Sequence, residues 1–304
     1  MLRECYFYKN RHSRLFALPL PRNNKRGIFM QQTLEISKQN SVQQRIAKYN
    51  RLLWRLGRGR PISFSLVLIL WYWVAHSGKV KSFLLPTPEA VFETFHRVLT
   101  DGDNVFDSTL WYHTSATLGR VLPGLAIGLT IGISLGYIIA KSPLLETLLS
   151  PIVVAFQSMP IVAYAPVLVI WFGTGSQSKI LTCVLIVFFP MLMNTIVGIR
   201  SVPQNLRDLM KMYRASRWQM FRKLEVPAAL PILLTGMKTS ATLSVIGAVV
   251  GEFIVANEGL GVLITEARGS YNTPLVFVSA ISMSALASTL YSIVAFIERR
   301  FMRR

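Results

Sequence analysis

Few side chains in this 304-residue sequence could do chemistry, and those few are scattered. The segment 173–179, GTGSQSK, lacks the spacing of a phosphate-binding loop. Cys5 and Cys183 are too far apart in the chain to imply a disulfide framework. The four histidines are isolated from one another, and we expect the last two at the surface: His12, His76, His96 and His113. We therefore predict no catalytic residue, no metal ligand and no directly bound cofactor.

Three polar residues stand out because their surroundings are apolar. Glu252 lies near the end of an apolar run, where an ionisable group is a functional candidate. Gln157 and Ser158 lie beside Pro160, and broken helices of this kind often line transport paths. We predict that these three residues line a translocation pathway. A glutamate that reaches the membrane interface, and a kink that only helps packing, remain open alternatives.

The long basic segment 201–231 interrupts the apolar second half of the chain. It is predicted to form two short helices with apolar stripes at helical spacing. The first stripe comprises Leu206, Leu209, Met210 and Tyr213, and the second comprises Trp218, Phe221 and Leu224. Exposed apolar stripes on a basic segment indicate a docking surface for another protein. A helix resting on lipid headgroups is the alternative.

Local signals set the ends of these two helices. Ser201 with Gln204, and Ser216 with Gln219, have the spacing of capping boxes. We predict that Pro227 and Pro231 end the unit, because proline lacks the amide hydrogen that a continuing helix needs.

The composition is that of a membrane protein, with 52% hydrophobic and only 15% charged residues. We predict an all-α fold with six spans: 62–78, 114–140, 151–172, 179–199, 232–256 and 275–296. Between them we expect a turn at 141–146, a turn at 257–273, and a short helix from Pro88 to Leu99 capped by Thr87.

The net charge of +19 follows the predicted topology and therefore does not indicate nucleic-acid binding. The segments on one side, namely 1–60, the turn at 141, 200–231 and 299–304, hold 26 of the 33 Lys and Arg residues. The positive-inside rule makes that side the cytosol, so both termini and the segment 201–231 are expected there. We predict a multi-pass protein of the bacterial inner membrane.

Small residues recur every fourth position in two of the spans. Such a stripe lets another helix approach closely, and a gap for substrate is the alternative. The first stripe comprises Gly124, Gly128, Gly132 and Gly136, and the second comprises Gly236, Ser240, Ser244 and Ala248. Cys183, in a neighbouring span, is expected to be a buried, inert thiol.

The chain divides into a basic N-terminal segment, 1–60, and a transmembrane domain, 61–300, that includes the loop 201–231. Met30 is an alternative start to Met1, so residues 1–29 are not necessarily translated. Residues 1–60 contain no apolar run long enough for a signal peptide.

The segment 201–231 resembles the coupling loop of the permease subunits of ABC importers, whose pattern begins with Glu-Ala-Ala followed by a glycine. Asp208 stands at the glutamate position and Arg214 at the glycine position. Ala215, Ser216 and Trp218, and later Pro227 to Pro231, match the rest of the pattern. The resemblance implies a type I importer fold. It assigns coupling to an ATPase subunit to Leu206, Asp208, Leu209, Tyr213, Arg214, Ala215, Ser216, Trp218, Phe221, Pro227 and Pro231.

Further motifs resemble one branch of that family, the permeases for nitrate, bicarbonate, taurine, alkanesulfonates and thiamine precursors. These motifs are Leu85-Pro86-Thr87-Pro88, Met159-Pro160, and Gly251-Glu252 followed by Gly259-Leu260-Gly261. The segment 242–264 is most similar to permeases for hydroxymethylpyrimidine-type thiamine precursors. The resemblance therefore implies import of such a precursor or a related small organic solute, and the branch's other solutes remain alternatives.

By this resemblance the partners are an ATPase subunit that carries ATP and Mg²⁺, an extracytoplasmic solute-binding protein, a second permease copy and membrane lipid. An ion-coupled secondary transporter is an alternative, although it would more often carry acidic residues in several spans. A membrane-embedded enzyme would need clustered His, Asp or Cys side chains, which the sequence lacks.

Overall fold

The computed structural model describes residues 59–302, and this part of the chain is built from helices and turns. A division after Ile69 separates two compact units, and every element from α3 onward belongs to the second. The elements are α2 (Gly59–His76), α3 (Pro88–Leu99), η1 (Val105–Asp107), α4 (Thr109–Lys141), α5 (Pro143–Ser158), α6 (Ile161–Phe172), α7 (Ser176–Arg200), α8 (Gln204–Met212), α9 (Arg217–Met220), η2 (Phe221–Glu225), α10 (Val226–Ile254), α11 (Leu260–Gly269) and α12 (Thr273–Met302). The predicted N-terminal segment and the alternative start at Met30 lie outside the described residues, except for the first two residues of α2.

Four helical runs among the described residues are long and apolar enough to cross a membrane. They are α4, α7, α12 and the continuous run Arg217–Ile254. The bent pair of α5 and α6 makes a fifth if it is counted as one span. The first predicted span, 62–78, falls on α2, and the part of α2 whose side chains the structure describes, Ser65–His76, is an apolar helix. The described residues therefore hold four or five spans where the sequence predicts six.

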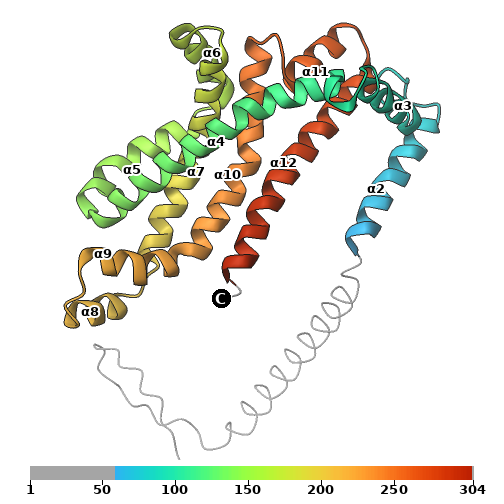
Figure 1. The fold of residues 1–304 in the computed structure, drawn as a ribbon. Helices are drawn as coiled ribbons and strands as arrows, with labels where there is room; N and C mark the ends of the chain where they lie inside the picture. Colours follow the sequence, from blue (N-terminus) through green and yellow to red (C-terminus); the bar gives the residue numbers. More distant parts are fainter. Residues whose placement is uncertain (1–58, 303–304) are drawn as a thin grey trace, which may run out of the picture. The chain divides into compact units, whose positions relative to one another are not determined.

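Helix α7 lies between α4 and α10, and small residues bring the three backbones together (Figure 1). Four glycines of α4 face four residues of α7 at the same spacing: Gly124, Gly128, Gly132 and Gly136 face Cys183, Val187, Met191 and Thr195. A β-carbon at Gly124 would lie 2.5 Å from the Cys183 sulfur, which is closer than a real contact allows. The glycine stripe thus lies at the contact between α4 and α7.

The second stripe of small residues places α10 on the other side of α7. Gly236 lies against Asn194 of α7, and the Ser240 hydroxyl donates to the Val187 carbonyl at 3.4 Å. Cys183 is fully buried between the helices, and its thiol lies 3.3 Å from the Ser244 carbonyl. The expectation of a buried thiol is therefore confirmed.

Proline breaks the third predicted span more completely than the sequence suggests. The segment 151–172 is two helices, α5 and α6, that meet at an angle of 96°. Met159 is extended because the ring of the following Pro160 disfavours a helical conformation there. Pro166 lies inside α6 without ending it. The predicted turn at 141–146 is also wrong, since only Ser142 separates α4 from α5 and its hydroxyl caps α5.

The prediction that Pro227 and Pro231 end the loop unit is wrong. Pro227 lies in the first turn of α10, and Pro231 lies inside that helix. At Pro227 the hydrogen-bond register changes from the π-helical turn of η2 to the α-helix, so the missing amide hydrogen costs little there. The packing of α10 along α7 holds the helix together past Pro231.

The opposite end of the bundle holds α3 and α11. Thr87 caps α3, and its hydroxyl accepts a hydrogen bond from the Ala90 amide, so the predicted helix from Pro88 to Leu99 is confirmed. The predicted turn at 257–273 instead contains α11, whose apolar residues Leu260 and Leu263 pack in a buried cluster with Val278 of α12. This packing stabilises a helix in a glycine-rich segment.

Helix α4 begins five residues before the predicted span. The Ser108 hydroxyl accepts a hydrogen bond from the Trp111 amide, and the Asp101 carboxylate accepts one from the Thr109 amide at 2.9 Å. These bonds satisfy donors of the first helical turn. The hydrogen bonding of Thr109 also holds the pKa of Asp101 below its ordinary value.

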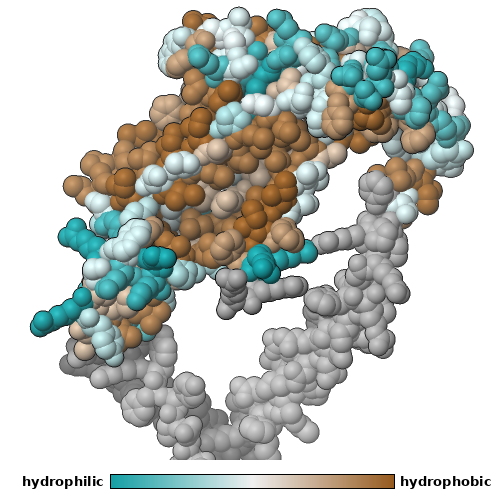
Figure 2. All heavy atoms as spheres, viewed as in Figure 1, coloured by the Kyte–Doolittle hydropathy of each residue, from teal (hydrophilic) through white to brown (hydrophobic). Residues whose placement is uncertain are grey.

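Hydropathy agrees with the arrangement of the helices. Figure 2 shows apolar side chains over the middle of the bundle and polar side chains gathered at its two ends. One polar end carries α8 and α9, and the other carries α3 and α11 (Figure 1). Two candidate sites follow, one at each end.

Candidate functional site

The basic loop forms two short helices, and local hydrogen bonds fix one of their starts. The predicted capping box of Ser216 and Gln219 is present, with bonds of 3.2 and 2.8 Å between the two residues. The predicted box of Ser201 and Gln204 is absent. The Ser201 hydroxyl instead donates to the Gly198 carbonyl of α7, and Pro203 precedes α8. Ser201 therefore belongs to the end of α7.

Arg214 makes the turn between α8 and α9. Its backbone is left-handed, with φ of 52°, although most L-residues avoid this region. The Arg214 amide donates to the Lys211 carbonyl at 2.9 Å, and the Ala215 amide donates to the Met210 carbonyl at 3.0 Å. This is the Schellman pattern, which usually has glycine at the left-handed position. The arginine thus takes the conformation that a glycine would give.

The loop presents an apolar surface with little cover from the rest of the chain. Five large apolar side chains of α8, α9 and the turn between them are exposed, and we call four of them the loop stripe: Leu206, Leu209, Tyr213 and Trp218; the fifth is Met212. Tyr213 is 78% exposed and Trp218 is 64% exposed. An apolar hollow of about 650 Å³ opens beside Trp218, between α4, α7 and α10. Large exposed aromatic residues on a charged loop indicate a contact surface.

The other predicted loop residues have smaller roles in the geometry. Asp208 is exposed and forms an ion pair with Lys211 at 3.1 Å, and the Gln204 amide donates to it at 3.0 Å. Phe221 is half-buried, with its ring edge-on to Tyr137 of α4 at 5.0 Å between centroids. Phe221 therefore anchors the loop to the bundle, and Trp218 packs on it at 5.5 Å between ring centroids while remaining 64% exposed.

The predicted pathway residues do not come together. Gln157 and Ser158 are exposed in the last turn of α5, and the Ser158 hydroxyl donates to the Val154 carbonyl at 2.8 Å. Glu252 lies at the other polar end, where its side chain is fully buried. Residues of this same chain enclose the Glu252 carboxylate, so it does not line an open cavity in this protomer.

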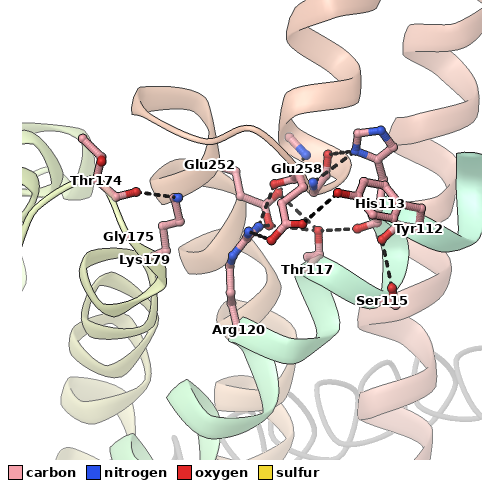
Figure 3. A network of polar contacts seen from close by, with 12 residues as sticks. Tyr112, His113, Ser115, Thr117, Arg120, Thr174, Gly175, Lys179, Glu252 and Glu258 are labelled. Atoms are coloured by element: carbon pink, nitrogen blue, oxygen red, sulfur yellow. Dashed lines mark hydrogen bonds and ion pairs between the residues drawn. The ribbon is translucent and has the colours of Figure 1, made fainter.

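Glu252 is the centre of a network that joins α4, α10 and α11 (Figure 3). The Arg120 guanidinium donates to the Glu252 carboxylate at 2.8 Å and to that of Glu258 at 2.7 Å. The Thr117 hydroxyl and the Gly261 amide each lie 2.9 Å from Glu252. We call this set the Glu252 clamp. A buried arginine and a buried carboxylate require such pairing because water is excluded around them.

Glycines close this clamp, which explains the Gly-Glu and Gly-Leu-Gly motifs. Gly259 has φ of 121° and packs directly on the Glu252 carboxylate. A β-carbon at Gly261 would lie 2.9 Å from that of Glu252, and one at Gly251 would lie 3.1 Å from the α-carbon of Lys179. Any larger side chain at these positions would push α11 or α7 away.

The expectation that His113 is a surface residue is wrong. His113 is only 8% exposed, and its Nδ1 lies 2.9 Å from the Gly259 carbonyl and 3.1 Å from the Gly259 amide. It therefore holds the turn before α11, together with the Thr117 hydroxyl, which accepts a bond from the Leu260 amide at 2.8 Å. His96 is exposed as expected.

Sequence reasoning missed Thr117, Arg120 and Glu258. One signal could have found the ion pair of Arg120 and Glu252. An arginine within an apolar helix requires an acidic partner, and Glu252 was the acidic residue available within a predicted span. Within residues 59–302, no group of three or more His, Cys, Asp or Glu side chains lies close enough together to hold a metal ion.

Comparison with known proteins places this arrangement in a family. A family model described as "binding-protein-dependent transport system inner membrane component" matches residues 128–303. The chain belongs to this family. It is therefore an ABC importer permease, and the solute remains to be inferred.

The similar curated proteins are permeases for different solutes. The permease is 39% identical over 274 residues to the riboflavin transport system permease protein RibX of Chloroflexus aurantiacus, which covers 90% of this chain and 98% of that protein. It is 34% identical over 227 residues to the formylaminopyrimidine transport permease protein ThiX of Halalkalibacterium halodurans, which covers 74% of this chain and 88% of that protein.

A solved structure shares the fold of the permease. An inward-facing form of the MetNI methionine ABC transporter matches with a TM-score of 0.54 and 22% identity. The match covers 61% of this chain and 92% of that chain. At this identity the likeness concerns the fold, and it agrees with the predicted type I importer fold.

The Glu252 clamp predicts unequal effects for its two carboxylates. Glu252→Ala should lower the free energy of unfolding by about 3–5 kcal/mol, because it leaves Arg120 buried without its enclosed partner. Glu258→Ala is the matched control. It should cost at most about 1 kcal/mol, because the Glu258 side chain is 40% exposed and Arg120 keeps Glu252. Equilibrium unfolding in mixed micelles measures both, and equal losses would contradict the role of burial.

The left-handed turn predicts an order of stability at position 214. Arg214→Gly and Arg214→Asn should keep or raise loop stability, because both residues enter this conformation readily. Arg214→Val should destabilise the turn, because a β-branched residue fits the left-handed region worse than arginine does. Hydrogen exchange of the Ala215 amide, which closes the Schellman pattern, reports the difference. If the Gly and Asn variants protect the Ala215 amide as poorly as the Val variant does, the lost charge explains the effect and the backbone explanation is wrong.

Proposed function

We propose that this permease is the membrane subunit of an ATP-driven importer and that the loop stripe docks into a separate ABC ATPase. The exposure of Tyr213 and Trp218 carries the proposal, since two large aromatic residues gain free energy when a partner covers them. The family match supports it, because residues 128–303 include the whole loop. ATP and Mg²⁺ then belong to the ATPase subunit.

The direction of coupling follows from the charge distribution. Lys and Arg gather on the segments that include α8 and α9, so we assign this end of the bundle to the cytosol, where ATP is. The end with α3 and α11 then faces the solute-binding protein. Each partner can shift the permease between inward-open and outward-open states only by binding the two states differently. A second copy of the chain completes the translocation pathway, with Gln157 and Ser158 as candidate lining residues.

The solute is proposed from the two relatives described above. Riboflavin and formylaminopyrimidine are both nitrogen heterocycles, and the riboflavin permease matches over almost its full length. We therefore propose that the permease imports a nitrogen-heterocyclic vitamin or vitamin precursor, with riboflavin ahead of the pyrimidine precursors. Taurine, alkanesulfonates and nitrate are the alternatives.

Docking is tested by removing the two most exposed aromatic side chains of the loop stripe. Tyr213→Ala with Trp218→Ala should abolish co-purification of the ATPase subunit while the permease still folds. Tyr271→Ala is the matched control, because Tyr271 is 81% exposed but lies just before α12, at the end away from the loop. An ATPase that binds the double variant at wild-type strength would contradict the docking role.

A separate measurement tests the energy source of transport. Uptake that persists in ATP-depleted proteoliposomes would favour an ion-coupled transporter.

The solute is tested with the complete transporter in proteoliposomes, together with its binding protein. Riboflavin should stimulate ATP hydrolysis and accumulate inside the vesicles, because a solute-loaded binding protein favours one state of the permease. Formylaminopyrimidine and taurine are tested in parallel. Stimulation by taurine alone would overturn the assignment to nitrogen heterocycles without affecting the docking result.

A further inference from the structure

A second buried carboxylate lies at the loop end of the bundle, separate from the Glu252 clamp. Glu225 is fully buried at the junction of η2 and α10. It accepts a hydrogen bond from the Tyr137 hydroxyl at 3.0 Å and forms an ion pair with Lys141, both from α4. Arg207 of α8 lies 3.8 Å from the same carboxylate. One side chain thus meets the loop, the end of α4 and the start of α10.

The backbone at this point is unusual. Residues Phe221–Glu225 form a π-helical turn, and the Val226 amide bonds to the Phe221 carbonyl five residues before it. Such turns are rare within helices and often occur at functional sites. Without this wider turn, Glu225 would lie at a different angle around the helix. The π turn therefore directs the carboxylate towards α4.

The three partners of Glu225 are not held equally. Tyr137 and Lys141 contact its carboxylate directly, whereas Arg207 stands 3.8 Å away, beyond hydrogen-bond distance. One Arg207 nitrogen donates to the Ile199 carbonyl at 2.5 Å, while its Nε is buried and has no hydrogen-bond partner among the described residues. Arg207, the contact from α8, is therefore held less closely to Glu225 than the two partners from α4.

We propose that Glu225 is the joint that passes movement of the docking loop to α4 as well as to α10. This inference rests on the proposed function, because the movement comes from the ATPase on α8. A displacement of α8 carries Arg207 against Glu225, and Tyr137 and Lys141 carry it onward to α4. Buried charges resist separation because an unpaired charge in an apolar interior is costly, so this joint transmits pulling as well as pushing.

A purely structural role makes a different prediction from a joint. A residue that only stabilises the fold should lower ATP hydrolysis and solute uptake together, because fewer molecules are folded. A joint should lower the solute transported for each ATP hydrolysed, while the ATPase still binds and turns over. The ratio of uptake to hydrolysis is therefore the measurement.

The test uses the complete transporter in proteoliposomes. Glu225→Gln keeps the size of the side chain and an acceptor for Tyr137 but removes the ion pairs, and it should lower the ratio about tenfold, a typical coupling strength between sites. Glu225→Asp, which keeps the charge, should restore part of the ratio. Arg207→Gln removes the contact of α8 with Glu225, together with the hydrogen bond to the Ile199 carbonyl, and should give the same loss. It keeps the test valid if Glu225→Gln folds poorly.

The matched control is another ion pair on α10 that does not touch the loop. Lys238 contacts Glu298 of α12 at 2.7 Å, and both side chains are largely buried. Lys238→Met with Glu298→Gln removes this pair and should leave the ratio unchanged.

Two outcomes would overturn the proposed joint alone. One is an unchanged ratio in both Glu225→Gln and Arg207→Gln, and the other is an equal loss of ATP hydrolysis and solute uptake. Failure of the wild-type permease to capture an ATPase would overturn the proposed function and the joint together.

Discussion

The structure depends on one constraint, which is that a charge buried in an apolar bundle must be paired. The helical run from Arg217 to Ile254 carries a buried carboxylate at each end, Glu225 and Glu252. Both find their cationic partners on α4, through Lys141 and Arg120. These two ion pairs tie α4 to the run from Arg217 to Ile254 near both of its ends, and both helices also pack along α7.

Patterns within a few residues of one another predicted much of this fold. The glycines of α4 and the small residues of α10 repeat at helical spacing, so their close packing could be expected before the partner helix was known. Thr87 and Ser216 cap helices because a cap depends on the next three residues. Ser201 has the same pattern but is held by α7, so the neighbouring element decided its role.

The parts that sequence reasoning missed depend on distant residues. Arg120 and Glu252 are 132 positions apart, and His113 and Gly259 are 146 apart, so no local pattern connects them. Pro231 shows the opposite failure. Its local signal ends a helix, but the packing of α10 on α7 overrides it. The loop residues were predicted because their apolar side chains recur at helical spacing within a short stretch of the sequence.

The close approach of α4 to α7 also limits where a solute can travel. At Gly124, Gly128, Gly132 and Gly136 the gap between the two helices is too small for even one added methyl group. No dissolved molecule can pass through such a seam, and the contact of α10 with α7 at Gly247 is equally tight. The surfaces of α4 and α10 that contact α7 are therefore closed to a solute in this conformation, and cross-linking scans for a pathway can omit the positions on them.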